Sequence, residues 1–182
     1  ASQTKDKDAL TQEGVAKVID EMRNEFDIVI CDSPAGIERG AFYAMYFADR
    51  AVVVVNPEVS SVRDSDRVLG IMSSKSRRAE QGQTPVKEHL LLTRYSPERV
   101  EKGDMMSIAD VEEILGVKVI GVIPEAPEVL SASNSGVPVI LDEQADAGQA
   151  YVDAVARLLG EDRPMRFTEP KRKGFFQRMF GG

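Results

Sequence analysis

The stretch Phe26-Asp-Ile-Val-Ile-Cys-Asp-Ser-Pro-Ala-Gly36 decides the fold of this chain. Its apolar run over residues 27–32 is typical of a buried strand, and it stops abruptly at Asp32. An apolar strand that ends in a single Asp can present a carboxylate to magnesium through a water, although strands also end in Asp for reasons of turn geometry. Pro34 stiffens the exit from the strand, and Gly36 allows a backbone N–H to approach a phosphate closely. The stretch therefore points to a site that handles phosphate.

Helical and extended patterns alternate along the rest of the chain. The first helix is expected around residues 15–22, with Thr11 as its N-cap. Continuous apolar strands separated by helices predict an α/β fold, with a mostly parallel sheet covered by helices on both faces. Further helices are expected at residues 38–48, 61–79, 107–115 and 147–159, and strands at residues 27–32, 51–56, 89–93 and 117–123.

Polar residues follow each apolar strand at once. The strand ends read Asp32-Ser-Pro-Ala-Gly36, Asn56-Pro-Glu58, Thr93-Arg-Tyr95 and Pro124-Glu125. Because the carboxyl ends of parallel strands meet at one edge of a sheet, these residues should line a single rim. That rim is the predicted functional site.

Composition and cysteine content indicate one globular domain in a reducing compartment. The chain has 182 residues, of which 42% are hydrophobic, enough for one sizeable core. Its one cysteine, Cys31, excludes a disulfide framework, and its position in an apolar run predicts a buried thiol that behaves as a small hydrophobe. With no signal peptide and no long apolar run, a cytoplasmic location is expected. We expect a domain over residues 1–160, a tether over 161–170 and a separate segment over 171–182.

The last twelve residues, hereafter the tail, have the pattern of a helix that lies on a membrane surface. On a helix, four apolar side chains gather on one side and basic residues surround them. The tail carries +4 and no acid, so the chain's net charge of −7 leaves −11 on the other 170 residues. The alternative is a small helix that packs back on the body. The residues concerned are Lys173, Phe175, Phe176, Arg178, Met179 and Phe180.

Residues 26–36 resemble the Walker B and switch II region of the MinD/ParA family of deviant Walker A ATPases. The match continues in order through residues 56–66, 89–95, 122–125 and 138–142, and the tail resembles the membrane-targeting helix of the membrane-bound members. The resemblance implies a P-loop-type ATPase fold and an ATP-driven switch that works with Mg²⁺. It also implies attachment to anionic lipid on the cytoplasmic face of the inner membrane and a role in positioning the division septum.

The resemblance also implies roles for individual rim residues. Asp32 is expected to be catalytic and to hold the magnesium-bound water, and Gly36 to sense the γ-phosphate. Thr93-Arg94 and Pro124-Glu125 are expected to border the adenine and ribose.

A second set of residues matches the region where the family dimerises with ATP and meets its partners MinC and MinE. These are Glu58, Ser60, Asp64 and Asp66, with Asn134 expected near the dimer face. The residues alone allow another interpretation of the two aspartates, because carboxylates near a helix start are favoured by the helix dipole.

One part of the family pattern does not occur in these 182 residues. No glycine is followed by lysine, so the glycine-rich phosphate loop is absent, and so is switch I. The resemblance begins partway into the family's domain, and the chain corresponds to about its last two thirds. The chain by itself is therefore expected not to hydrolyse ATP. The alternative function is a non-enzymatic, membrane-attached interaction module.

Overall fold

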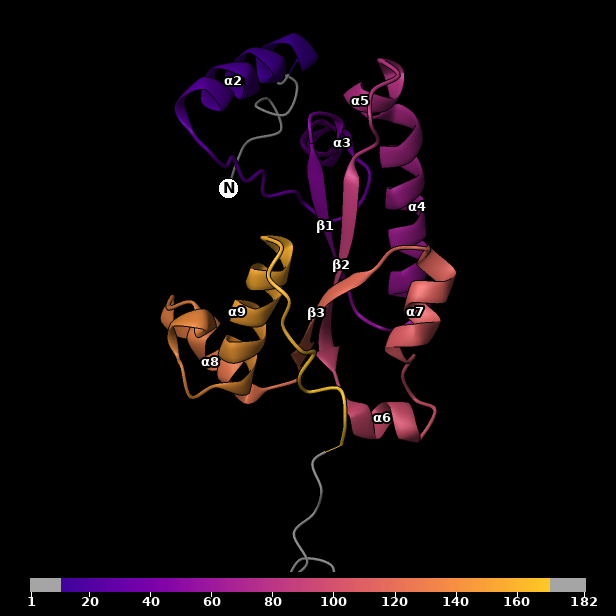
Figure 1. The fold of residues 1–182 in the computed structure, drawn as a ribbon, viewed down its shortest axis with the longest axis vertical. Coiled ribbons are helices and arrows are strands. Elements are labelled where there is room, and N and C mark those ends of the chain that lie inside the picture. Colours follow the sequence, from indigo (N-terminus) through magenta and orange to yellow (C-terminus); the bar gives the residue numbers. More distant parts are fainter. Residues whose placement is uncertain (1–10, 171–182) are drawn as a thin grey trace, which may run out of the picture. The chain divides into compact units, whose positions relative to one another are not determined.

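The computed structural model describes residues 11–170, which form an α/β fold around a sheet of three strands in the order β1-β2-β3 (Figure 1). None of the described helices is long and apolar enough to cross a bilayer. The elements are α2 (Gln12–Glu25), α3 (Arg39–Tyr46), β1 (Arg50–Val55), α4 (Val59–Lys75), α5 (Arg77–Glu80), β2 (Lys87–Tyr95), α6 (Pro97–Glu101), α7 (Ile108–Leu115), β3 (Val119–Pro124), α8 (Pro127–Ser135), the 3-10 turn η1 (Val139–Leu141) and α9 (Asp146–Leu158).

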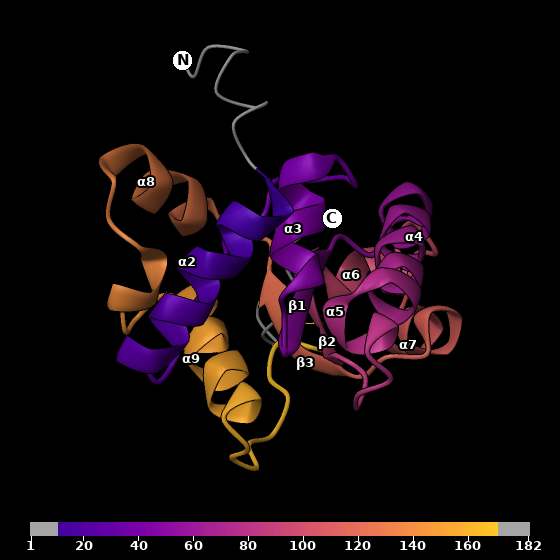
Figure 2. The ribbon, with the colours of Figure 1, turned by 90° about the horizontal axis from the view of Figure 1, so that it is seen from above.

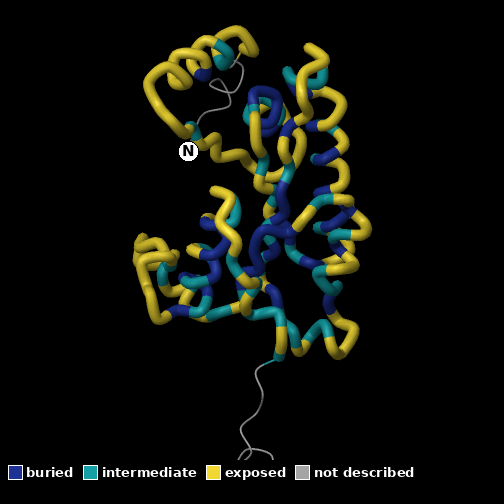
Figure 3. The backbone as a smooth tube through the Cα atoms, viewed as in Figure 1, coloured by how far each residue is buried: buried dark blue, intermediate teal, exposed yellow. Residues whose placement is uncertain are grey.

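The fold divides into two compact units, each with its own buried residues (Figure 3). The first unit comprises residues 11–52 and 63–88, and the second comprises residues 53–62 and 89–170. In the second unit, β2 and β3 pair in parallel, with Leu92 opposite Val122. Helices α9 and α7 lie on opposite faces of this pair (Figure 2). The parallel sheet with helices on both faces that the sequence predicts is confirmed.

Helix α9 packs directly on β3 because small residues line its inner face. A Cβ at Gly121 of β3 would lie 2.5 Å from the Cβ of Ala154 and 2.8 Å from a methyl group of Leu91. Gly148 has the same role at the start of the helix, where a Cβ would meet the carbonyl oxygens of Asp142 and Val139 at 2.5 and 2.6 Å. Glycine at both positions therefore sets how closely α9 approaches its neighbours.

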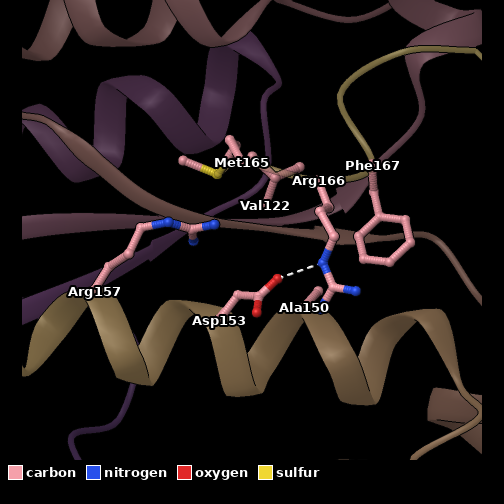
Figure 4. A pocket seen from close by; sticks show the side chains of 7 residues that line it. All are labelled: Val122, Ala150, Asp153, Arg157, Met165, Arg166 and Phe167. Atoms are coloured by element: carbon pink, nitrogen blue, oxygen red, sulfur yellow. Dashed lines mark hydrogen bonds and ion pairs between the residues drawn. The ribbon is translucent and has the colours of Figure 1, made fainter. Parts of the chain in front are cut away.

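The segment that follows α9 is fixed to that helix by arginines. Asp153 of α9 is 6% exposed, and its carboxylate accepts hydrogen bonds from Arg166 at 2.6 Å and Arg163 at 3.5 Å (Figure 4). The guanidinium of Arg157 donates to the carbonyl oxygens of Arg163, Pro164 and Ile120. Residues 163–166, which the sequence places in a tether, thus make specific contacts with the domain.

The first unit is organised around Asp49, which pairs with two arginines. Arg23 from α2 and Arg78 from α5 each place a guanidinium nitrogen 2.8 Å from this carboxylate. Apolar packing accompanies the ion pairs, with Tyr46 and Phe47 stacked edge to face at a ring distance of 4.9 Å. These contacts hold α2 against the residues that follow α3.

The strand predicted over residues 27–32 is wrong, because these residues form no strand in the structure. A strand needs a neighbour to pair its backbone N–H and C=O groups, and no described strand pairs with this segment. Ile28 and Ile30 are 67% and 87% exposed. Cys31 is also exposed, contrary to the prediction of a buried thiol. Residues 27–32 therefore have a sequence suited to a strand, but no described strand pairs with them.

Helix ends at which the sequence places a capping residue lie where expected in the structure. Thr11 caps α2 by accepting a hydrogen bond from the N–H of Gly14. Ser107 and Asp110 form a capping box at the start of α7, and Gly116 ends that helix at φ +66°. The helix predicted over residues 61–79 instead ends at Lys75, because Ser76 caps the separate short helix α5. Helices α6 and α8 were not predicted.

The close approach of α9 predicts opposite effects for two glycine substitutions. Gly121→Ala should lower the free energy of unfolding by about 1–3 kcal/mol, because the added methyl collides with Ala154. Gly70→Ala is the matched control: Gly70 lies in α4 with nothing within 4 Å of its Cβ position, so alanine should stabilise by roughly 0.5–1 kcal/mol. Urea denaturation measures both, and equal effects would contradict the packing described.

The buried Asp153 predicts a pH-dependent contribution to stability. Burial alone raises the pKa of this carboxyl, but the hydrogen bonds and charge of Arg166, with help from Arg163 and Arg157, outweigh burial and hold the pKa below its usual range. A depressed pKa stabilises the fold above the unfolded value near 3.9, and the stabilisation is lost as pH falls through the lower folded value.

Asp153→Asn should therefore lower the free energy of unfolding by about 1.5–3 kcal/mol between pH 5 and 7, the typical contribution of hydrogen bonds to a charged group. The difference from wild type should shrink as pH falls below about 4. Urea denaturation across this pH range measures it. If the difference in free energy of unfolding between wild type and Asp153→Asn stays constant down to pH 2, the charge of Asp153 does not contribute to stability.

Candidate functional site

The carboxyl ends of β1, β2 and β3 meet through two hydrogen bonds in the second unit. The hydroxyl of Thr93, near the end of β2, donates to the side-chain oxygen of Asn56 after β1 at 2.9 Å. The backbone N–H of Glu125, after β3, donates to the carbonyl oxygen of Tyr95 at 3.1 Å. Three of the four predicted strand ends are thus tied side by side into one polar rim, hereafter the rim.

The turn after β1 is held from both sides. The N–H of Asn56 donates to the hydroxyl of Ser61 at 3.1 Å, and the N–H of Glu58 donates to the carbonyl oxygen of Asn56 at 2.7 Å. Pro57 is buried, and its carbonyl oxygen accepts from Met106 N–H at 3.1 Å. The Asn56 side chain is therefore placed by a rigid turn. Sequence reasoning located this strand end but did not count Asn56 among the site residues.

The last residues of β2 carry a backbone constraint. Arg94 is exposed and has φ +55°, in the left-handed region that non-glycine residues rarely adopt. It lies between the half-buried Thr93 and Tyr95, which is 4% exposed. Burial raises the pKa of the Tyr95 phenol, as expected for a side chain packed in the core beside Arg94. Tight anchoring on both sides of Arg94 explains how the unfavourable backbone is maintained.

The turn after β3 leads directly into α8. Pro124 ends the strand, Glu125 is exposed, and α8 begins at Pro127, whose ring suits a helix start. Asn134, predicted near the dimer face, lies exposed in the last turn of α8. Thr93, Arg94, Pro124 and Glu125 are thus all placed in one unit.

Asp32 and Gly36 are placed differently from these rim residues. Both are exposed and lie in the first unit, in the stretch without secondary structure between α2 and α3. Gly36 has φ +97°, a backbone conformation that glycine alone adopts readily.

Four of the predicted partner residues are exposed at or near the start of α4. Glu58 immediately precedes the helix and lies 3.8 Å from a guanidinium nitrogen of Arg99. Ser60 is in the first turn of α4, and Asp64 and Asp66 follow in its second turn. They are available for contact with another molecule. The predicted membrane residues of the tail lie outside the described residues.

The rim combines a hydroxyl, an amide, a carboxylate and a guanidinium. Such groups recognise a polar ligand by hydrogen bonds. Within residues 11–170, no cluster of three or more His, Cys, Asp or Glu side chains could hold a metal ion. A magnesium ion usually needs only one or two protein carboxylates when it is bound together with substrate phosphates. A single carboxylate such as Asp32 therefore fits magnesium that arrives with a nucleotide.

The sequence is similar over its entire length to septum site-determining proteins. It is 66% identical over 183 residues to the septum site-determining protein MinD of Escherichia coli strain K12, covering all of this chain and 68% of that protein. The chain belongs to the MinD family. The MinD of Neisseria meningitidis serogroup B is 62% identical with the same coverage. No protein-family model matches the chain.

Solved structures of MinD proteins share the fold. The MinC:MinD cell division protein complex of Aquifex aeolicus is 38% identical, with a TM-score of 0.78, over 88% of this chain and 63% of that one. MinD of Pyrococcus horikoshii, solved with Mg-ADP, is 21% identical with a TM-score of 0.69, and the match covers 88% of this chain and 63% of that one. At this level of identity the likeness shows the fold alone. The chain thus spans about two thirds of the length of its MinD relatives.

The hydrogen bond between Thr93 and Asn56 predicts different results for two substitutions. Thr93→Val keeps the shape but removes the donor, so it should lower the free energy of unfolding by about 1–2 kcal/mol. Thr93→Ser keeps the hydroxyl and should retain most of that stability. Thr84→Val is the control, because Thr84 lies exposed in the loop before β2. If urea denaturation shows Thr93→Ser to be as unstable as Thr93→Val, the hydroxyl does not join the strand ends.

Proposed function

We propose that this chain forms the carboxyl-terminal part of a MinD-type ATPase switch that positions the division septum. In this proposal the complete protein dimerises with ATP, attaches to the cytoplasmic face of the inner membrane and recruits MinC-like and MinE-like partners. The observation that carries it is the 66% identity to Escherichia coli MinD over the whole chain. The alignment spans the whole chain, so it includes the rim, the start of α4 and the tail.

The rim supports a role in binding the base and ribose of ATP. Thr93 and Arg94 border one side and Pro124 and Glu125 the other, with the strand ends joined by the Tyr95–Glu125 backbone bond. Ligands in parallel α/β folds bind at this edge of the sheet. Asp32 would hold a magnesium-bound water, and the magnesium would neutralise phosphate charge. The fold neighbour from Pyrococcus horikoshii was solved with Mg-ADP.

The exposed start of α4 supports a role in partner binding. Glu58 and Ser60 are exposed and lie next to the rigid turn at Asn56, and Asp64 and Asp66 are exposed further along α4. A nucleotide that orders the turns of the rim would therefore also order the start of this surface. The MinC complex of the related Aquifex aeolicus MinD supports a MinC-like partner.

Because these 182 residues contain no phosphate-binding loop, we predict that the chain alone does not hydrolyse ATP. Its sequence contains no glycine-rich loop with a lysine, which would supply the backbone cradle and the positive charge for the triphosphate. A phosphate-release assay at saturating Mg-ATP should show no turnover above background, whereas the complete protein should hydrolyse ATP. If the 182-residue chain hydrolyses ATP and Asp32→Ala abolishes that hydrolysis, the prediction is contradicted.

The tail predicts a substitution that separates membrane binding from nucleotide binding. A buried Phe contributes roughly 1.5–3 kcal/mol, so replacing Phe176 by a charged residue should weaken each tail by more than tenfold. Because two tails in a dimer act together through effective concentration, the loss compounds. Phe176→Glu in the complete protein should therefore abolish sedimentation with anionic vesicles in the presence of ATP.

The control is Leu159→Glu, which also places a charge on an exposed apolar residue, 63% exposed, but outside the tail. It should sediment like wild type, and both variants should bind nucleotide normally. Raising salt should weaken wild-type binding, because the basic residues act through charge. Normal sedimentation of Phe176→Glu would show that the tail is not the anchor.

A further inference from the structure

An apolar groove lies between α8, η1 and the start of α9, all within the second unit. It has a volume of about 340 Å³ and is lined by Val129 and Ala132 of α8, Val137 and Ile140 around η1, and Tyr151 of α9. Val137 and Ile140 are 51% and 36% exposed. The rim residues do not line this groove, so nucleotide binding as proposed above leaves it unused.

The groove has acidic surroundings. Between residues 125 and 156 the chain has six acidic side chains and no Lys, Arg or His, and one of the six, Asp153, is paired with Arg163 and Arg166 from outside this stretch. Three of the acids, Glu128, Asp142 and Glu143, are exposed on α8 and beside η1. A ligand for this groove should therefore combine apolar side chains with positive charge.

The chain packs on the core beneath the groove just before the tail begins. Phe167 packs on a buried cluster of Ile123, Ala147 and Ala150, and three residues that line the groove pack on the same cluster: Val129, Val139 and Tyr151. Phe167 has φ +63°, and the ion pair between Arg166 and Asp153 holds this turn against α9 (Figure 4). The tail starts four residues later, at residue 171. Twelve residues can extend to roughly 40 Å, so the tail can reach the groove of its own molecule.

We propose that this groove is a docking site for the tail of the same chain. The tail supplies the matching chemistry: Phe175, Phe176, Met179 and Phe180 are apolar, and the segment carries four basic residues and no acid. Docking within one molecule is favoured over binding a second copy, because a short connection gives a millimolar effective concentration. The proposal rests on the proposed role of the tail as membrane anchor. The docked tail hides the apolar residues that the membrane would bind, so groove and membrane compete for it.

Photo-crosslinking in the complete protein tests the docking directly. Phe175 is replaced by the photoreactive p-benzoylphenylalanine, and the nucleotide-free protein is irradiated without lipid. Mass spectrometry should map the crosslinks to residues 129–151 within a monomer, and anionic vesicles should reduce their yield. Crosslinks between two chains, crosslinks elsewhere on the domain, or no crosslinks would overturn the proposal.

A matched pair of substitutions tests the competition. Val137→Lys places a positive charge in the groove and should remove the crosslinks. If the docked tail outnumbers the free tail about ten to one, the variant should bind anionic vesicles about tenfold more tightly without nucleotide. Val155→Lys is the control, because Val155 is 46% exposed but does not line the groove, and it should leave crosslinks and vesicle binding unchanged.

The two proposals can fail separately. If Phe176→Glu sediments normally with vesicles while the groove crosslinks persist, the tail docks but is not the anchor. If Phe176→Glu abolishes sedimentation but Val137→Lys leaves crosslinks and vesicle binding at the wild-type level, the anchor stands and the docking proposal is overturned.

Discussion

The close contact between α9 and β3 is the constraint on which the second unit depends. Gly121 leaves no room for a side chain against Ala154, and Gly148 allows the start of α9 to meet the carbonyl oxygens of η1. Because α9 is placed this tightly, its Asp153 lies where Arg163 and Arg166 can pair with it. The groove beside α8 and the route of the chain toward the tail both follow from this one packing contact.

The rim obtains its geometry from backbone and side-chain bonds between strand ends rather than from a buried charge cluster. Asn56, Thr93 and the Tyr95–Glu125 pair join the ends of all three strands, and Ser61 extends the connection to the start of α4. The surface proposed for partners and the rim proposed for nucleotide therefore share one rigid turn. This arrangement gives a physical route by which an occupied rim can change the start of α4.

The parts of the structure that could be predicted from the sequence are those that local chemistry determines. Thr11, Ser107 and Gly116 specify helix ends by bonds within four residues, and α2 and α7 begin or end there. The strand expected over residues 27–32 could not be decided in this way, because strand formation depends on a pairing partner far away in sequence.

Contacts between distant residues explain the rest of what the sequence did not reveal. Nothing in the composition of residues 161–170 distinguishes a free tether from a segment paired with Asp153. The bond between Asn56 and Thr93 joins two side chains 37 residues apart, and only the parallel alignment of the strands brings them together. The three strand ends at Asn56, Thr93 and Glu125 were predictable as a group, whereas the bonds between them were not.

Hydrogen exchange on the complete protein tests most directly the claim that the strand ends form a nucleotide rim linked to α4. Addition of Mg-ATP should slow amide exchange at residues 93–96 and 124–126 and at residues 56–62, because ordering these turns protects their backbone N–H groups. Exchange in α7, at residues 108–115, should not change. Protection confined to regions outside the rim, or equal protection of α7 and the rim, would contradict the account.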